Sequence, residues 1–161
     1  MRAAAPRPSR RPRLVLLGAV LAALLTSVGL TSAAPAQAAS GTPIVGVASG
    51  RCLDVTGNTQ AIRTRVIIWD CNNQANQAWT LTAAGELRVF DGDRCLDVSG
   101  SSLQPGGTVQ IYTCTGGANQ KWRVNADQTI VGVQSGLCLD VTGGSTARGA
   151  YVQTWTCHGR R

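Results

Sequence analysis

The chain has 161 residues, 15 of them lysine or arginine and 8 aspartate or glutamate, and its formal net charge is +7. Five arginines lie within residues 2–13, so the rest of the chain carries a net charge of about +2 and a single lysine. With so few basic side chains, this part of the chain lacks the stripe of positive charge with which nucleic-acid-binding proteins neutralise phosphates. We therefore expect no nucleic-acid partner.

The first 38 residues have the three-part layout of a secretory signal. The arginines precede an apolar run from Leu14 to Leu30, and Ala36-Gln37-Ala38 fits a small-residue cleavage site. The run is at the short limit for a membrane-spanning helix and is rich in small residues. We expect residues 1–38 to be a signal peptide, with twin-arginine export left open by Arg10-Arg11. Residues 39–161 are then extracellular, without a stable membrane anchor.

One pattern recurs three times after this leader at a period of 43 residues. Each copy begins with Cys-Leu-Asp-Val and has a second cysteine 19 residues after the first. The cysteines are Cys52 and Cys71, Cys95 and Cys114, and Cys138 and Cys157. Fixed-period self-similarity indicates a repeat architecture. We predict one domain of three repeats, at about residues 43–84, 85–127 and 128–161.

The cysteines all follow the leader, which agrees with an oxidising destination. Two pairings respect the three-fold pattern: within each repeat, or cyclically from one repeat to the next. Pairing within a repeat needs only local closure, and each bridge would stabilise the fold by about 3 kcal/mol in the loop-entropy model. A zinc site is disfavoured because no Cys-x2–4-Cys pair occurs. We expect no metal and no cofactor.

Short β-branched runs separated by clusters of Gly, Asn, Ser and Thr predict an all-β protein. The first repeat has its runs at residues 44–47, 52–55, 66–71 and 79–81. Those of the second repeat are at 87–89, 95–98, 109–114 and 122–124. The third repeat has runs at 130–133, 138–141 and 152–157. We therefore predict four short strands per repeat, with the last strand missing.

Strand parity separates core from surface, because alternate side chains point to opposite faces. Leu53 and Val55 share one face, which leaves Cys52 and Asp54 on the other. If the aliphatic face is the core, every repeat has an outward aspartate and an outward aromatic ring 15 residues later. The pairs are Asp54 and Trp69, Asp97 and Tyr112, and Asp140 and Trp155. This pattern predicts a binding surface, whereas Trp79 and Trp122 are expected in the core.

These features resemble the ricin B-chain type of lectin repeat (R-type lectin), which also occurs as the family 13 carbohydrate-binding module of secreted glycosidases. The resemblance covers about Pro43 to Cys157. It rests on three in-register copies of Cys-Leu-Asp-Val and its partner cysteine, and on Gln-x-Trp in the first two repeats. It implies a β-trefoil of twelve strands, six closing a short barrel and six capping it, with pseudo-three-fold symmetry and a disulfide inside each repeat.

The resemblance also implies a sugar pocket in each repeat, built from the aspartate, the aromatic residue, the polar residue after the second cysteine, and the Asn-Gln before the tryptophan. These are Asp54, Trp69, Asn72, Asn76 and Gln77 in the first repeat, Asp97, Tyr112, Thr115, Asn119 and Gln120 in the second, and Asp140, Trp155 and His158 in the third. The residue types suit this chemistry. A carboxylate accepts hydrogen bonds from adjacent hydroxyls, and an aromatic face stacks on the C–H groups of a sugar.

The third repeat departs from the pattern, because its Asn-Gln and its Trp would fall beyond Arg161. We therefore expect two competent sites and one doubtful site. An open strand edge and an unfilled core position should lower stability by several kcal/mol, if the loss resembles an aromatic truncation. Whether the chain is a truncated product stays open.

The predicted function is that of a secreted, non-catalytic, monomeric and multivalent module. It would bind galactose- or xylose-type sugars on polysaccharides or glycans. Catalysis is not expected, because the chain holds one glutamate, Glu86, and one histidine, His158. These provide neither the usual carboxylate pair of a glycosidase nor a convincing Ser-His-Asp set. The alternatives are a trefoil protein-interaction or inhibitor module, and the detached binding module of a secreted glycosidase.

Overall fold

The computed structural model describes residues 40–158, so the predicted signal peptide lies outside the described residues. Within them no helix is long and apolar enough to cross a membrane. The strands are β1 (Cys52–Val55), β2 (Val66–Trp69), β3 (Thr80–Leu81), β4 (Leu87–Val89), β5 (Arg94–Val98), β6 (Gly107–Tyr112), β7 (Trp122–Val124), β8 (Ile130–Gly132), β9 (Cys138–Val141) and β10 (Val152–Trp155). The single-turn 3-10 helices are η1 (Thr56–Asn58), η2 (Ala75–Gln77), η3 (Phe90–Gly92), η4 (Ser99–Ser101), η5 (Ala118–Gln120) and η6 (Thr142–Gly144). The predicted all-β class is confirmed.

The segment at residues 44–47 is the one predicted run that forms no named strand. Its counterparts in the other repeats lie between two partners: β4 between β3 and β5, and β8 between β7 and β9. The segment itself has an isolated bridge from Val45 to Cys52 of β1. The third-repeat counterpart of β3 and β7 is not among the described residues. Val45 and Val47 are 48% and 63% exposed, and the expected open edge stays a prediction.

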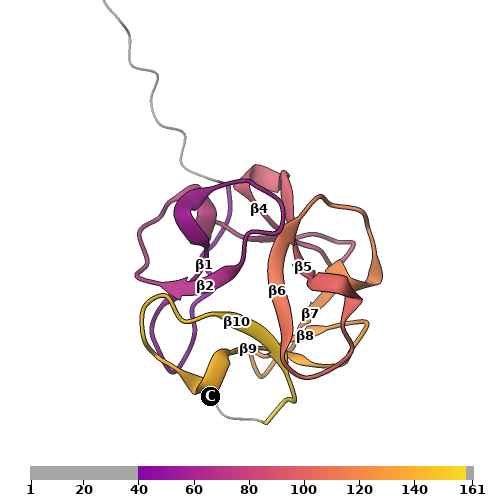
Figure 1. The fold of residues 1–161 in the computed structure, drawn as a ribbon. Coiled ribbons are helices and arrows are strands. Elements are labelled where there is room, and N and C mark those ends of the chain that lie inside the picture. Colours follow the sequence, from indigo (N-terminus) through magenta and orange to yellow (C-terminus); the bar gives the residue numbers. More distant parts are fainter. Residues whose placement is uncertain (1–39, 159–161) are drawn as a thin grey trace, which may run out of the picture. The chain divides into compact units, whose positions relative to one another are not determined.

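The third strands of the three repeats, β2, β6 and β10, surround a common centre (Figure 1). β10 pairs with β6, and isolated bridges join β6 to the residue just before β2, and β2 to the residue just before β10. The paired residues are Gln153 with Thr108, Gln110 with Arg65, and Ile67 with Tyr151. The three pairs occupy equivalent positions in the three repeats, which follow one another at the 43-residue period. This relation is the pseudo-three-fold symmetry of a β-trefoil, and it brings loops of different repeats together.

The second and third strands of each repeat form an antiparallel hairpin closed by a disulfide. The hairpins are β1–β2, β5–β6 and β9–β10. The bridges join Cys52 to Cys71, Cys95 to Cys114, and Cys138 to Cys157. Pairing within each repeat is therefore confirmed. In every hairpin the first of these cysteines lies directly across the ladder from the candidate aromatic residue.

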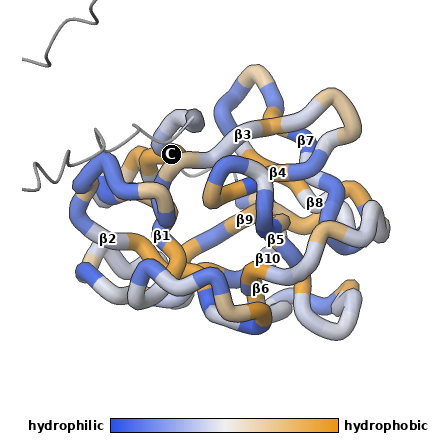
Figure 2. The backbone as a smooth tube through the Cα atoms, turned by 90° about the horizontal axis from the view of Figure 1, so that it is seen from above, coloured by the Kyte–Doolittle hydropathy of each residue, from blue (hydrophilic) through white to orange (hydrophobic). Residues whose placement is uncertain are grey.

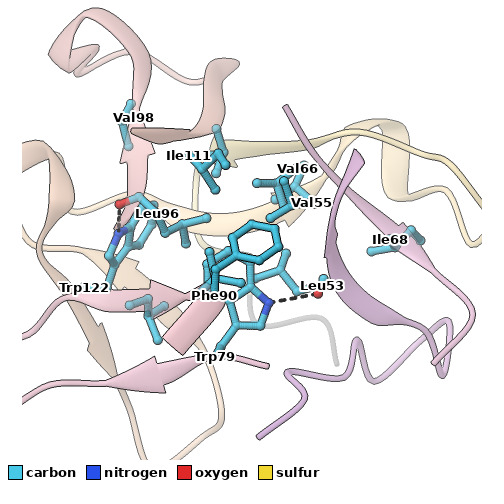
Figure 3. Packing of buried hydrophobic residues seen from close by; sticks show 14 residues of the cluster. Leu53, Val55, Val66, Ile68, Trp79, Phe90, Leu96, Val98, Ile111 and Trp122 are labelled. Carbon is cyan, nitrogen blue, oxygen red and sulfur yellow. Dashed lines mark hydrogen bonds between the residues drawn. The ribbon is translucent and has the colours of Figure 1, made fainter. Parts of the chain in front are cut away.

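The aliphatic faces of the hairpins meet in one core. Short hydrophobic stretches alternate with hydrophilic ones along the chain (Figure 2), as expected for strands that bury one face. Trp79 and Trp122 are each 2% exposed, which confirms their predicted core position. The Nε1 of Trp79 donates to the Leu53 carbonyl at 2.9 Å, and that of Trp122 to the Leu96 carbonyl at 3.0 Å. Figure 3 marks both hydrogen bonds. Each tryptophan thereby fixes the end of its repeat to the second strand.

Replacing Trp79 with alanine should lower the free energy of unfolding by about 3–5 kcal/mol, because the change removes a large buried ring. Trp155→Ala is the matched control, since the same substitution removes a ring that is 42% exposed. We expect the control to lose about 1 kcal/mol or less. Urea unfolding of the disulfide-bonded protein measures both losses. Equal losses would contradict the core role of Trp79.

Candidate functional site

In the second repeat a buried carboxylate is surrounded by amide donors. Asp97 of β5 is 4% exposed. Its Oδ2 accepts hydrogen bonds from Asn119 Nδ2 at 2.8 Å and Gln120 Nε2 at 2.9 Å. Its Oδ1 accepts from Gln110 Nε2 at 3.0 Å, directly across the ladder on β6. Three donors on two oxygens hold this carboxylate in one orientation.

Gln120 connects this aspartate to the loop that follows the second cysteine. Its Oε1 accepts from the backbone N–H of Thr115 at 2.8 Å, and its Nε2 also donates to the Thr113 carbonyl at 2.8 Å. The side chain is fully buried. The Gln120 side chain is therefore hydrogen-bonded to Asp97 and to the backbone on both sides of Cys114.

The first repeat has the same arrangement. Gln77 Nε2 donates to Asp54 Oδ2 at 2.6 Å and to the Asp70 carbonyl at 3.0 Å. Its Oε1 accepts from the backbone N–H of Asn72 at 2.9 Å. The side chain of Asn76 donates to the last backbone carbonyl of β1 at 3.2 Å. We call these two arrangements, Gln77 with Asp54 and Gln120 with Asp97, the glutamine clamps.

The two clamped carboxyl groups differ in their surroundings. Across the ladder from Asp54 stands Ile67, where the second repeat has Gln110. Burial therefore raises the pKa of Asp54 above its ordinary value, and the hydrogen bonds from Gln77 and Asn76 oppose that rise only in part.

The prediction that these aspartates are outward is wrong for the first two repeats. Asp54 and Asp97 do lie on the face opposite the aliphatic pair, as parity requires, but they are 3% and 4% exposed. The reason is that η2 and η5 fold over the hairpins, so their Asn-Gln side chains cover the carboxylates. The side chain of Asp140 has no such turn over it among residues 40–158 and is 17% exposed.

The candidate aromatic rings are more accessible. Trp69 is 37% and Trp155 42% exposed, which confirms the predicted outward position of both, and Tyr112 is half-buried. The polar residues after the second cysteines, Asn72 and Thr115, are also exposed. The first two repeats thus combine an accessible ring, a polar loop and a carboxylate beneath that loop.

Each ring is approached by a loop from another repeat, which the sequence analysis did not predict. A backbone N–H of that loop donates to the carbonyl just before the ring residue, at 2.7 or 2.8 Å. The donors are Gly149 at Trp69, Arg63 at Tyr112 and Gly106 at Trp155. All three have positive φ, at 86°, 68° and 89°. These donors are spaced by the same 43-residue period, so the period itself could have identified them.

The neighbouring loop also places a positive charge at the first site. The Arg148 guanidinium lies 5.0 Å from the centre of the Trp69 ring, and its Nη1 is 3.3 Å from Asp70 Oδ2. Asp70 pairs with Arg51 as well. A cation beside an aromatic face is favourable by about 0.5–1 kcal/mol at an exposed position. Arg148 and Gly149 therefore belong to the surroundings of this site.

In the third repeat the aspartate has a different partner. His158 Nε2 lies 2.8 Å from Asp140 Oδ2. Asp140, His158 and Trp155 line one cavity, so the structure brings the three predicted residues of this repeat together. The counterparts of Asn119 and Gln120 are not among the described residues, and the clamp is seen in two repeats.

Glu86 is held in an ion-pair cluster. It is 5% exposed and accepts from Lys121 Nζ at 3.0 Å and Arg88 Nη2 at 2.7 Å. These hydrogen bonds, that of Lys121 above all, lower the pKa of Glu86. A general acid of a glycosidase needs the opposite shift. Among residues 40–158, no three His, Cys, Asp or Glu side chains are grouped to hold a metal ion.

Residues 40–161 match the family model of the ricin-type beta-trefoil lectin domain. Three solved structures illustrate the similarity. The designed three-fold symmetric protein ThreeFoil is 32% identical with a TM-score of 0.69, over 72% of this chain and 89% of that one. An exo-beta-1,3-galactanase from Clostridium thermocellum is 30% identical with a TM-score of 0.64, over 73% of this chain and 27% of that one. A non-toxic homologue of type II RIPs from Momordica charantia (bitter gourd), in complex with alpha-methyl-D-galactoside, is 28% identical with a TM-score of 0.63, over 72% of this chain and 42% of that one.

The two clamped aspartates should respond differently to replacement by asparagine. Asp54→Asn keeps a carbonyl for the Gln77 donor and removes a buried charge, so the free energy of unfolding at pH 7 should stay equal or rise. In Asp97→Asn an amide NH2 group faces one of the three donors and cannot accept its hydrogen bond. The free energy of unfolding should therefore fall by about 1–3 kcal/mol. Urea unfolding at fixed pH measures both. A larger loss of stability for Asp54→Asn than for Asp97→Asn would contradict this description of the surroundings of the two carboxyl groups.

The pH dependence gives a second readout. Because folding raises the pKa of Asp54 from 3.8, the unfolded chain releases this proton first as the pH rises. The parent protein therefore loses stability between pH 3.8 and the higher folded pKa. Asp54→Asn removes this loss, so its stability relative to the parent should increase from pH 3 to pH 7. A difference that is constant over this range would contradict the raised pKa.

Proposed function

The chain belongs to the ricin-type beta-trefoil lectin family, and on that premise we propose that it is a secreted, non-catalytic module for galactose- or xylose-type sugars. The observation that carries the proposal is the recurrence, in two repeats, of an accessible aromatic ring beside a clamped carboxylate. In this proposal residues 1–38 are the signal peptide and residues 39–161 act as a monomer. The three disulfides agree with an oxidising destination.

Each site would read a sugar with two kinds of contact. The C–H face of the ring stacks on Trp69 or Tyr112, whose polarised faces attract partially positive hydrogens. Hydroxyl groups then donate to the remaining lone pairs of the clamped carboxylate and bond with the polar loop at Asn72 or Thr115. Gln77 is 1% exposed, so it acts by holding the carboxylate and the loop in place rather than by touching the sugar.

The amide side chains of Asn76 and Asn119 differ in access. Asn76 is 3% exposed and its Oδ1 has no hydrogen-bond partner among the described residues, whereas Asn119 is half-buried. A buried acceptor without a partner is costly. Like Gln77, Asn76 is too buried to touch a sugar, so in this proposal it helps to hold the end of β1 in place through its bond to the Val55 carbonyl.

A shallow site of this type binds weakly, at about millimolar Kd, equivalent to about 4 kcal/mol. Two such sites on one rigid domain gain strength on a polymer, because the second contact becomes intramolecular. We therefore propose repeats 1 and 2 as the working sites and a polysaccharide or clustered glycan as the target. Within residues 128–158, repeat 3 has the aspartate and the ring, and no clamp is seen there.

Galactosyl ligands are the first to test. The bitter gourd structure contains alpha-methyl-D-galactoside, and the Clostridium protein is an exo-beta-1,3-galactanase. The present chain spans 42% and 27% of those two chains.

The direct test is a pull-down on immobilised galactose, xylan and mannan with the double variant Trp69→Ala/Tyr112→Ala. Trp69 is 37% exposed, Tyr112 is half-buried, and neither belongs to the core cluster, so their removal should leave the fold intact and abolish retention. The matched control is Leu81→Ala/Val124→Ala. It removes two side chains that are also one period apart, each 46% exposed, and that belong to no candidate site.

Retention of the control but not of the ring variant is the expected result. Retention of both would move binding away from these sites. If the folded parent protein binds no galactosyl, xylosyl or mannosyl glycan on an array, the carbohydrate proposal fails. A trefoil protein-interaction or inhibitor module then becomes the better account.

A further inference from the structure

The loop that reaches Trp69 from the third repeat carries a positive charge that the repeat pattern does not require. Its Gly149 is the backbone donor at this site, and Arg148 lies one residue earlier. One and two periods earlier, the same position holds Pro105 and Ile62. Both are uncharged, so Arg148 distinguishes the first candidate site from the other two.

A different arginine fastens this loop to the first repeat. Arg51 Nε donates to the Thr146 carbonyl at 3.0 Å. The second site has the same bond, from Arg94 Nε to the Gln60 carbonyl at 2.7 Å. Arg51 and Arg94 lie one period apart, as the repeat pattern requires. The loop is thus held by a hydrogen bond that both sites share and that does not involve Arg148.

The guanidinium of Arg148 shares its acidic partner with a second arginine. Its Nη1 is 3.3 Å from Asp70 Oδ2, while Oδ1 of the same carboxylate pairs with Arg51. Two positive charges therefore face one negative charge. The side chains of Arg148 and Asp70 are 58% and 55% exposed, and exposed pairs of this kind contribute little to stability. An arginine has five N–H donors, and the contact with Asp70 uses one of them.

This charge lies beside the ring on which the proposed sugar stacks. The guanidinium carbon of Arg148 is 5.0 Å from the centre of the Trp69 ring. Among residues 40–158, no guanidinium lies over the Tyr112 ring. The loop at Tyr112 has Ile62, 42% exposed, at the equivalent position, and the exposed Arg63 follows it. A sugar stacked on Trp69 would therefore have a cation within reach, at a position that is apolar in the second site.

We propose that Arg148 makes the Trp69 site selective for sugars that carry an anionic group, a carboxylate or a sulfate. The inference rests on the proposed function, because it takes sugar binding at Trp69 as its premise. The C–H face of the sugar stacks on the ring, and the anion accepts N–H bonds from Arg148 in place of the long contact to Asp70. A guanidinium suits this role, since it binds a carboxylate through two parallel hydrogen bonds. The Tyr112 site keeps its preference for neutral sugars.

The test compares ligands that differ at carbon 6. Methyl galactoside has a neutral CH2OH group there, methyl galacturonoside has a carboxylate, and methyl galactoside 6-sulfate has a sulfate ester. Amide and indole chemical shifts of the disulfide-bonded protein give one Kd from the signals around Trp69 and another from those around Tyr112. The variant is Arg148→Gln. The matched control is Arg123→Gln, which removes the same charge from an exposed arginine of β7 that belongs to no candidate site.

We expect at least one of the two acidic ligands to bind at Trp69 about 3- to 10-fold more tightly than methyl galactoside, as suits a charge-assisted contact at an exposed position. The ligand that gains identifies the anion as carboxylate or sulfate. Arg148→Gln should abolish this preference without weakening the binding of methyl galactoside, and Arg123→Gln should keep it. The preference should be absent at Tyr112. It should also decrease when the ionic strength rises from about 0.01 M to about 1 M, because the screening length falls from about 30 Å to about 3 Å.

Two results would overturn the proposal while leaving the proposed function intact. In the first, methyl galactoside binds at Trp69 and neither acidic ligand binds there more tightly, or the preference survives in Arg148→Gln. In the second, Arg148→Gln binds all three ligands more tightly, which would mean that Arg148 covers the ring instead of selecting an anion. Failure of all three ligands to bind at either ring would contradict the proposed function itself, and this inference with it.

Discussion

The hydrogen bonds of the buried glutamine side chains are the interaction on which the rest of this structure depends. Gln77 and Gln120 each bind an aspartate of the second strand and both sides of the second cysteine. Two residues later, Trp79 or Trp122 enters the core and donates to the carbonyl just before that aspartate. The Gln-x-Trp spacing thus connects the face that carries the aspartate to the core. The glutamine positions the carboxylate, and the tryptophan two residues later fills the space beneath it.

In the part of the third repeat that the structure describes, both the surroundings of the aspartate and the core beneath it differ from those of the first two repeats. Where no clamp and no indole are present among the described residues, Asp140 has His158 as its partner and Leu139 borders a cavity of about 1010 Å³. The candidate sites also depend on contacts between repeats, because the loop that approaches each aromatic ring comes from a different repeat. At Trp69 and Trp155 that loop has glycine at positive φ, and at Tyr112 it has Arg63. A site in this fold therefore belongs to two repeats.

Much of the fold could be predicted from the sequence, because three copies of one pattern average out the ambiguity of any single strand. The hairpins, the disulfides inside each repeat and the buried positions of Trp79 and Trp122 followed from period and parity, together with the family resemblance. Exposure of the aspartates could not be predicted in this way. Parity assigns a face of the hairpin, but the covering of Asp54 and Asp97 depends on a turn more than 20 residues further along the chain. The contact of Arg148 with Trp69 is likewise set by tertiary packing between repeats.

The central claim of the proposed function is that a sugar site requires the glutamine clamp, which the structure shows in repeats 1 and 2. The most direct measurement is an amide and indole chemical-shift titration with methyl galactoside or, if that does not bind, with the best monosaccharide found on an array. The account predicts saturation at two sites per chain, with shifts centred on residues 69–77 and 112–120. Three equivalent sites, or shifts centred on Trp155 and His158, would contradict it.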